Sequence, residues 1–298
     1  MDRLAAMRLF TRVVERRSFT QAAHDLDIPR STATQVIKQL EDRLGVGLLQ
    51  RTTRTVRPTL DGEAYYRRCL AILDDVEDAE GAFRGAVPSG QLRIEVQGTL
   101  ARHFLLPAIP RFLADFPQIS IAMSEGERWV DVVQEGVDCV LRYGALPDSD
   151  LVARQVTMLE RITVAAPAYL ERAGHPKSLG DLSSHQGVCL RSITTGALRA
   201  FEFIEGDVTR EVEVDSPLSV TGTESFRDAV LLGLGLAQMP LFHVERDLAE
   251  NRMVRVLADH PVPPAPVSIL YPRNRQLSPR VRLFIDWVVR QFALYDRA

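Results

Sequence analysis

Hydrogen-bonding and cationic side chains gather in two short stretches near the N-terminus, and neither stretch contains a carboxylate. Arginine and lysine bind phosphates, and glutamine and lysine can also read base edges in the DNA major groove. The two stretches, residues 30–38 and 51–57, therefore predict a nucleic-acid-binding surface. Together with a preceding serine, the candidate contacts are Ser18, Arg30, Ser31, Thr32, Thr34, Gln35, Lys38, Arg51, Thr52, Thr53, Arg54 and Arg57.

The local sequence predicts a winged helix-turn-helix to hold these residues. Ser18 is suited to cap a first helix, and the Asp27-Ile28-Pro29 run ends it because proline cannot continue a helix. A second helix is expected over residues 30–44, with Gly45 as its C-terminal cap. The arginine- and threonine-rich stretch suits a wing hairpin. The alternative, a helical bundle with a solvated polar face, explains neither the caps nor the basic wing. Five residues form the predicted buried stripe of the second helix: Ala33, Val36, Ile37, Leu40 and Leu44.

A helix of nearly 40 Å, at ~1.5 Å per residue, is predicted to follow, with Thr59 as its N-cap. Its apolar residues suggest a narrow seam that pairs with the same helix of a second chain, and the alternative is packing against its own body. A two-fold pair of heads would read a partly palindromic DNA site. The seam consists of Leu60, Ala64, Cys69, Ile72, Leu73, Val76, Ala79 and Phe83.

The rest of the chain alternates between strand and helix patterns, which predicts two α/β lobes. We expect an α+β multi-domain protein with a DNA-binding domain over residues 1–60, a linker helix over 61–88 and an effector domain over 89–298. Lobe one takes residues 89–161 and 267–298, and lobe two takes 162–266. Within lobe one, single helices are expected over residues 100–116 and 129–135.

The sequence resembles the LysR-type transcriptional regulators. The resemblance implies a bacterial DNA-binding regulator, dimeric or tetrameric, whose periplasmic-binding-protein-like domain binds a small-molecule effector. It implies operator or promoter DNA and further copies of the chain as partners, with RNA polymerase as another candidate. The chain departs from the family's commonest recognition-helix start, because Arg30 stands where a proline is usual. The likeness rests on Phe10, Ser18, Phe19, Ala22, Ala23, Leu26, Ser31, Ile37, Leu40, Glu41, Leu44, Gly45, Leu48, Leu49, Arg51, Thr59 and Gly62, and later on Gly233, Gly235 and Pro240.

Ligands of two-lobed α/β domains lie at the carboxyl ends of strands and the N-termini of helices. Arg142 could pair with a carboxylate, or instead form an internal salt bridge with Glu125 or Asp138. Thr99 and Thr223 could bind the effector or serve only as helix caps. The expected effector is a small carboxylated or aromatic metabolite. The strand-end rule gives Thr99, Leu100, Arg142, Tyr143, Thr194, Thr195, Thr223 and Ser225 as its contacts.

Charge and composition agree with a DNA-binding head on an acidic body. Residues 1–60 hold 11 Lys and Arg and 6 Asp and Glu, a balance of +5, whereas residues 61–298 hold 25 and 33, a balance of −8. No signal peptide or membrane-spanning run is expected, and three widely spaced cysteines fit a reducing cytoplasm. No metal-ligand spacing or catalytic motif is recognised, so no cofactor, no metal and no enzymatic activity are expected.

Two other functions are compatible with the sequence. One is a redox sensor that uses Cys139 and Cys189, which requires two thiols within disulfide reach and a lowered thiol pKa. The other is a small-molecule-binding protein or enzyme in which the head serves only for dimerisation. The basic wing and the acid-free helix face argue against the second.

Overall fold

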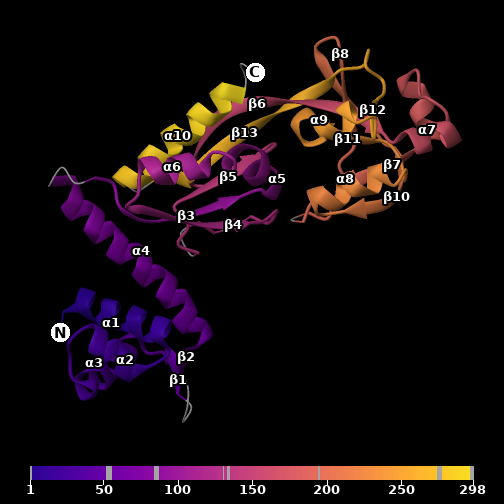
Figure 1. The fold of residues 1–298 in the computed structure, drawn as a ribbon. Coiled ribbons are helices and arrows are strands. Elements are labelled where there is room, and N and C mark those ends of the chain that lie inside the picture. The colour runs from indigo at the N-terminus through magenta and orange to yellow at the C-terminus, as the bar shows by residue number, and fades with distance from the viewer. Residues whose placement is uncertain are drawn as a thin grey trace.

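The computed structural model describes residues 2–51, 56–83, 87–129, 131–132, 135–193, 195–273 and 277–295. A compact helical head is joined by one long helix to an elongated body of two lobes (Figure 1). In the described part of the chain, no helix combines the length and apolar character needed to cross a membrane.

The head is the predicted winged helix-turn-helix. The Ser18 hydroxyl accepts the Gln21 amide at 3.3 Å, and Gly45 ends the third helix with φ +73°. Both caps therefore form as expected. The head contains α1 (Arg3–Arg16), α2 (Phe19–Asp25), α3 (Arg30–Leu44) and the antiparallel strands β1 (Leu49–Arg51) and β2 (Val56–Pro58).

One apolar core joins the three helices of the head. Phe10, Ala22 and Ile37 are completely buried in it, and the small alanines allow α2 and α3 to approach closely. Leu44 was expected in the same stripe but is 39% exposed. It is the last residue of α3, where the helix extends beyond the core.

The long helix α4 (Leu60–Phe83) begins as part of the head. The Thr59 hydroxyl caps it by accepting the Gly62 amide at 2.9 Å. Gly62 is required for close approach, because a Cβ there would collide with the Leu48 carbonyl. Cys69 lies in the head core, and the rings of Phe10 and Tyr65 are 5.4 Å apart.

The predicted seam of α4 is therefore partly wrong. Leu60 is 87% exposed, because at 3.6 residues per turn it lies roughly 180° around the helix from Cys69. The first turns of α4 pack on their own head, as in the alternative. Ile72 is 39% exposed and Val76 is half-buried, so they remain candidates for pairing with a second chain. The side chains of Ala79 and Phe83 lie outside the described part.

A mixed sheet in the order β11-β6-β13-β5-β3-β4 extends through both lobes, with β5, β3 and β4 in lobe one and β11 (Ala237–Pro240) in lobe two. Strands β3, β4 and β5 are parallel, and the two long strands β6 and β13 run antiparallel to each other. The aromatic residues of α10 and the π-helical turn η1 fill the core on one face. Lobe one contains β3 (Gly90–Val96), α5 (Gly98–Leu100), η1 (Ala101–Leu105), α6 (Ile109–Asp115), β4 (Ile119–Glu125), β5 (Cys139–Tyr143) and α10 (Pro279–Tyr295).

Two helix predictions in lobe one are wrong. The helix expected over residues 100–116 is divided into η1 and α6, because Pro107 lacks an amide hydrogen and disrupts the preceding turn. The helix expected over 129–135 is absent from the described residues of that segment. Immediately before that segment, the carbonyls of Gly126 and Arg128 accept hydrogen bonds from the Arg142 guanidinium.

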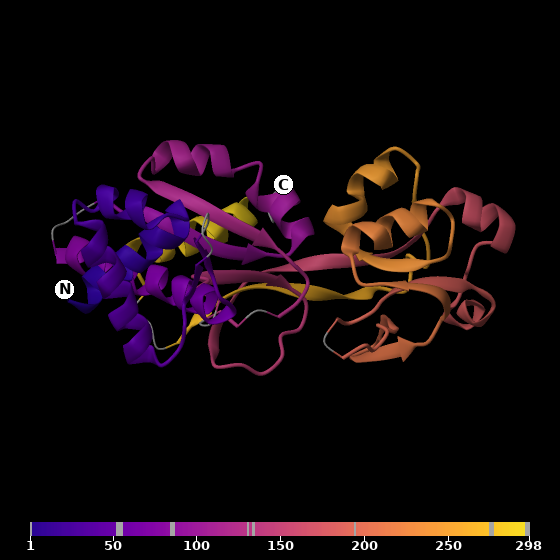
Figure 2. The ribbon, with the colours of Figure 1, turned by 90° about the horizontal axis from the view of Figure 1, so that it is seen from below.

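Lobe two is connected to lobe one by β6 (Leu151–Ala165) and β13 (Val262–Pro272), which run through both (Figures 1 and 2). Leu159 and Val267 belong to the core of lobe one, whereas Ile162 and Val262 belong to cores of lobe two. The other elements of lobe two are α7 (Pro167–Ala173), η2 (Leu179–Ser184), β7 (Gln186–Leu190), β8 (Phe201–Glu205), β9 (Val208–Val212), β10 (Asp215–Val220), α8 (Thr223–Leu231), β11 (Ala237–Pro240), α9 (Leu241–Ala249) and β12 (Val254–Arg255).

Candidate nucleic-acid and effector sites

The outward face of α3 presents polar and cationic side chains to solvent. Arg30, Ser31, Gln35 and Lys38 are exposed, and the two threonines between them, Thr32 and Thr34, are half-buried. The Thr34 hydroxyl donates to the Arg30 carbonyl at 3.1 Å. The Ser18 hydroxyl is engaged in its helix cap. The face can therefore meet DNA mainly through its long, exposed side chains.

Glu41, the first acid of α3, is held by the backbone ahead of the wing. Its Oε1 accepts the amides of Leu48 and Leu49 at 2.8 and 3.0 Å. These two hydrogen bonds anchor the start of β1 and hold the carboxylate at the end of α3 that is far from Arg30. The outward face of α3 thus keeps its positive character.

The wing is described only at its base. β1 pairs with β2 from Leu49–Pro58 to Arg51–Val56, and Arg57 projects into solvent from β2. The side chain of Arg51 and the residues Thr52, Thr53 and Arg54 lie outside the described part of the chain. Their DNA contacts stay predictions.

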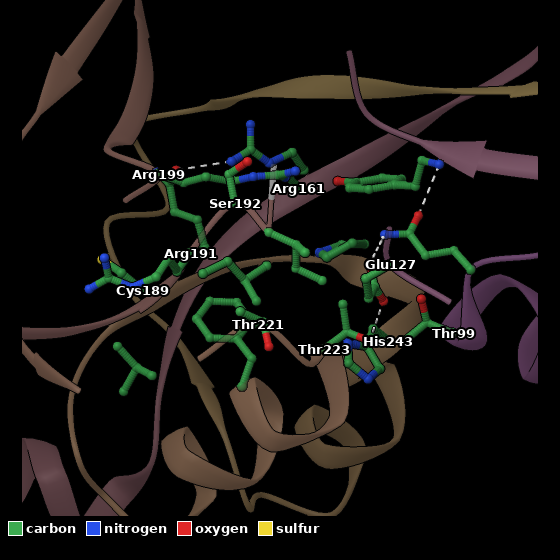
Figure 3. Close-up of a pocket in the computed structure, with 18 of the residues that line it drawn as sticks. Thr99, Glu127, Arg161, Cys189, Arg191, Ser192, Arg199, Thr221, Thr223 and His243 are labelled. Atoms are coloured by element: carbon green, nitrogen blue, oxygen red, sulfur yellow. Dashed lines mark hydrogen bonds between the residues drawn. The ribbon is translucent and has the colours of Figure 1, made fainter. Parts of the chain in front are cut away.

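A cavity of about 150 Å³ lies between the two lobes. It is located where β3, β5, β7 and β10 end, as the strand-end rule predicts for α/β sheets. Figure 3 shows side chains entering it from both lobes. Its walls are formed by Gln97, Thr99, Glu127, Trp129, Tyr143, Arg161, Val188, Cys189, Leu190, Arg191, Ser192, Ile193, Arg199, Ala200, Phe201, Thr221, Thr223, Phe226, Gln238, Pro240 and His243.

Three of the predicted effector contacts, Thr99, Tyr143 and Thr223, lie on this wall. Neither threonine caps a helix, because the cap positions of α5 and α8 are Gln97 and Gly222. The threonine hydroxyl of Thr223 instead donates to Glu127 Oε1 across the lobes at 3.4 Å.

The other described candidates are not on the wall. Leu100 is completely buried in the core of lobe one. Ser225 is exposed, since two residues along α8 turn it roughly 200° away from Thr223. The Thr195 hydroxyl accepts the Ala197 amide at 3.3 Å within a turn. Thr194 lies outside the described residues.

The prediction that Arg142 binds the effector is wrong. Successive strand residues point to opposite faces, so Tyr143 faces the cavity and Arg142 points away from it. The guanidinium is buried against Glu95 at 2.6 Å and donates to the carbonyls of Gly126 and Arg128 at 2.6 and 2.5 Å. The internal salt bridge weighed as the alternative does form, but its partner is Glu95. Arg142 positions the segment that carries Glu127 and Trp129.

The sequence patterns did not predict the main charged residues of the cavity wall. Arg161 lies within the long strand β6, and Arg191 and Arg199 flank the turn between β7 and β8. Arg191 and Arg199, close to strand ends of lobe two, were a usable signal, but the chain contains 34 arginines, so arginine alone marks no site. Glu127 comes from a stretch expected only to connect β4 to a helix.

Burial lowers the pKa of His243 to about 4, so this imidazole is neutral near pH 7. Its Nε2 lies 3.5 Å from Glu224 Oε1 without forming a hydrogen bond. Glu224 also pairs with Arg102 of lobe one at 2.8 Å. Together with the bond between Thr223 and Glu127, this ion pair holds the lobes at one side of the cavity.

The two thiols of the redox alternative lie in different hydrophobic cores. Cys139 belongs to the core of lobe one, and burial raises its thiol pKa well above the usual value. Cys189 belongs to lobe two, where its Sγ lies 2.8 Å from the Ser216 hydroxyl. For Cys139 this raised pKa is the opposite of the lowered thiol pKa that the redox alternative requires. Among the described residues no group of three His, Cys, Asp or Glu is placed to hold a metal ion.

Comparisons with known proteins match both halves of the chain. A family model described as "LysR substrate binding domain" matches residues 85–293, and one described as "Bacterial regulatory helix-turn-helix protein, lysR family" matches residues 4–63. The chain is 36% identical to the uncharacterized HTH-type transcriptional regulator YhjC of Escherichia coli, over 97% of both chains. It is 34% identical to an HTH-type transcriptional repressor of Pseudomonas aeruginosa, over 98% of this chain and 93% of the relative.

A solved structure supports the same architecture. CrgA, a LysR-type transcriptional regulator from Neisseria meningitidis, aligns with a TM-score of 0.61 and 29% identity. The alignment covers 96% of this chain and 98% of CrgA. The likeness therefore extends over the head, the long helix and both lobes.

Proposed function

Because the chain belongs to the LysR-type family of DNA-binding transcriptional regulators, we propose that α3 reads an operator sequence under the control of an effector bound between the lobes. The exposed acid-free face of α3 carries this proposal. In this proposal Gln35 and Lys38 contact base edges, and Arg30 and Arg57 contact phosphates. We propose boundaries near residues 60 and 88, which would divide the chain into a DNA-binding domain, a linker helix and an effector domain.

The reading unit is proposed to be a dimer, with the tetramer as its larger assembly. One face of the first turns of α4 packs on the head, so the pairing surface is proposed to lie farther along the helix, from Ile72 onward. Two heads carried on paired helices would meet two half-sites of one operator. The protein would act in the cytoplasm, without catalysis, and alter the access of RNA polymerase to a promoter.

The segment 126–136 is proposed to transmit the effector signal to α4. On one side Glu127 and Trp129 line the cavity. On the other, Gly136 packs on the linker helix so closely that a Cβ there would lie 3.3 Å from the Arg67 carbonyl oxygen. Between them, the Arg128 guanidinium makes two hydrogen bonds with the Glu135 carboxylate, at 2.9 and 2.7 Å. A ligand that favours one lobe arrangement would thereby bias the position of α4.

The test is a fluorescence-anisotropy titration of the full chain on the DNA upstream of its own gene, against scrambled DNA, over a salt series. We expect selective binding that weakens steeply with salt. Equal affinity for the two DNAs at every salt concentration would contradict the proposal for this operator region, and no binding at low salt would contradict DNA reading altogether.

A further inference from the structure

The charges on the cavity wall are distributed unevenly. Arg161 is neutralised by Glu202, whose carboxylate lies 2.5 Å away. Arg191 is held by neutral acceptors, the Ser219 hydroxyl at 2.9 Å and the Gly196 carbonyl at 2.9 Å. Within the described residues, the Arg199 guanidinium makes no hydrogen bond or ion pair. Lobe two therefore presents two positive charges that no carboxylate of the described chain balances.

A hydroxyl without a partner adds to this end of the cavity. The Tyr143 oxygen is buried, lines the cavity and has no hydrogen-bond partner in the described structure. Burial raises the pKa of Tyr143 to about 12, and Arg161 and Arg199 lie close enough to oppose that rise. The phenol is thus a protonated donor beside the arginines. A buried donor of this kind normally has an acceptor, which a ligand would supply.

The opposite end of the cavity accepts hydrogen bonds. The Glu127 carboxylate accepts hydrogen bonds from the Gln97 side-chain amide at 2.6 Å and from the Thr223 hydroxyl at 3.4 Å. A carboxylate has about four lone-pair sites, so it retains capacity for a donor from the ligand. Figure 3 shows Glu127, Thr99 and Thr223 together, away from Arg191 and Arg199. Apolar side chains, among them Phe201 and Phe226, line the wall as well.

From these features we propose that the effector is a small carboxylic acid with an apolar middle and a hydroxyl or ammonium donor at its other end. Its carboxylate meets Arg199 and the Tyr143 hydroxyl, and its donor meets Glu127. The inference rests on the proposed function, because it names the chemical class of the molecule sensed at the same site. A ligand of this form touches both lobes and so can stabilise one arrangement of them.

Two sets of three compounds separate the two ends. The aromatic set is para-hydroxyphenylacetate, its carboxamide and phenylacetate, and the aliphatic set is ε-aminocaproate, ε-aminocaproamide and caproate. Each is titrated into the full chain. The two readouts are tryptophan fluorescence and the Tm. A ligand in the cavity should change the emission of Trp129, which lines it, whereas the other tryptophan, Trp287, is buried in lobe one.

We expect the acid that carries a donor to have an affinity about tenfold higher than that of its carboxamide. The same difference is expected between this acid and the acid without a donor. Arg199→Gln should abolish the preference for the acid over the amide, and Glu127→Gln the preference for the donor. Arg210→Gln, an exposed arginine outside the cavity, is the matched control and should preserve both.

The inference is overturned if the amide binds as tightly as the acid, or if the acid preference survives in Arg199→Gln. It is also overturned if none of the six compounds, at millimolar concentration, changes the emission or the Tm. DNA titrations on the same preparations separate the two levels. Selective DNA binding with a failed ligand preference refutes only the ligand class, whereas loss of selective DNA binding by the unsubstituted chain refutes the proposed function.

Discussion

The α3 face and the inter-lobe cavity are assembled in different ways. The face comes from one helix, with its candidate contacts between Arg30 and Lys38, and a cap or stripe residue places each of them. The cavity takes its wall from separate segments that extend from Gln97 to His243. A site on one helix depends on local periodicity, whereas a site between lobes depends on contacts that are distant in sequence. The following substitutions test this difference, beginning with the largest expected effect.

Arg142→Ala should affect the cavity most and the head least. It leaves Glu95 buried without its partner, and it removes the guanidinium that holds the segment 126–128 through the carbonyls of Gly126 and Arg128. Breaking a buried pair costs about 3–5 kcal/mol, so lobe one should unfold at lower urea concentration. Arg154→Ala, which breaks an exposed pair with Asp286, is the control and should cost less than about 1 kcal/mol. Equal losses in the two variants would contradict the structural role of Arg142.

Lys38→Ala should produce the converse pattern. Removing one base-reading side chain should weaken selective DNA binding by about 1–3 kcal/mol, with no change in ligand-induced fluorescence. Lys177→Ala provides the matched control, because it removes the only other lysine of the chain, at an exposed position in lobe two. Anisotropy on operator and scrambled DNA measures the difference. An identical loss on both DNAs would reassign Lys38 to phosphate binding.

Ser18→Ala should lower the stability of the head by about 1 kcal/mol, because the Gln21 amide loses its cap. Ser18→Asp should restore the cap through a carboxylate acceptor while placing a negative charge near DNA. Thermal unfolding measures the cap, and DNA affinity measures the contact. If Ser18→Asp recovers stability but not affinity, Ser18 also lies against the DNA backbone; recovery of both would leave it only a cap.

Thr223→Val should have the smallest effect. It removes the hydroxyl that joins α8 to Glu127 over 3.4 Å, a bond worth roughly 0.5–1.5 kcal/mol at most. We expect a change of a few-fold in the affinity for the donor-bearing acid and none in DNA affinity without ligand. Isothermal titration measures the first. A large change in ligand-free DNA binding would show that this single bond already couples the lobes to the head.

The amino-acid sequence alone determined the head. Ser18, Pro29 and Gly45 act through their own backbone geometry and nearest amides, so the helix ends and the outward face of α3 follow from local rules. The strand pattern likewise determined the two-lobed body, and the strand-end rule placed Thr99, Tyr143 and Thr223 correctly on a common wall.

Only the tertiary structure decided which charges face the cavity. Arg142 and Tyr143 are neighbours on one strand, so their side chains point to opposite faces. The sequence does not say that Tyr143 faces the cavity and Arg142 the buried interior. Arg161 and Arg199 reach the cavity because β6 and the turn before β8 converge there in lobe two. The outward turn of Leu60 and the burial of Cys69 were decided in the same way, by the helix face that meets α1. Packing selects one face of each element, and that selection depends on partners far along the chain.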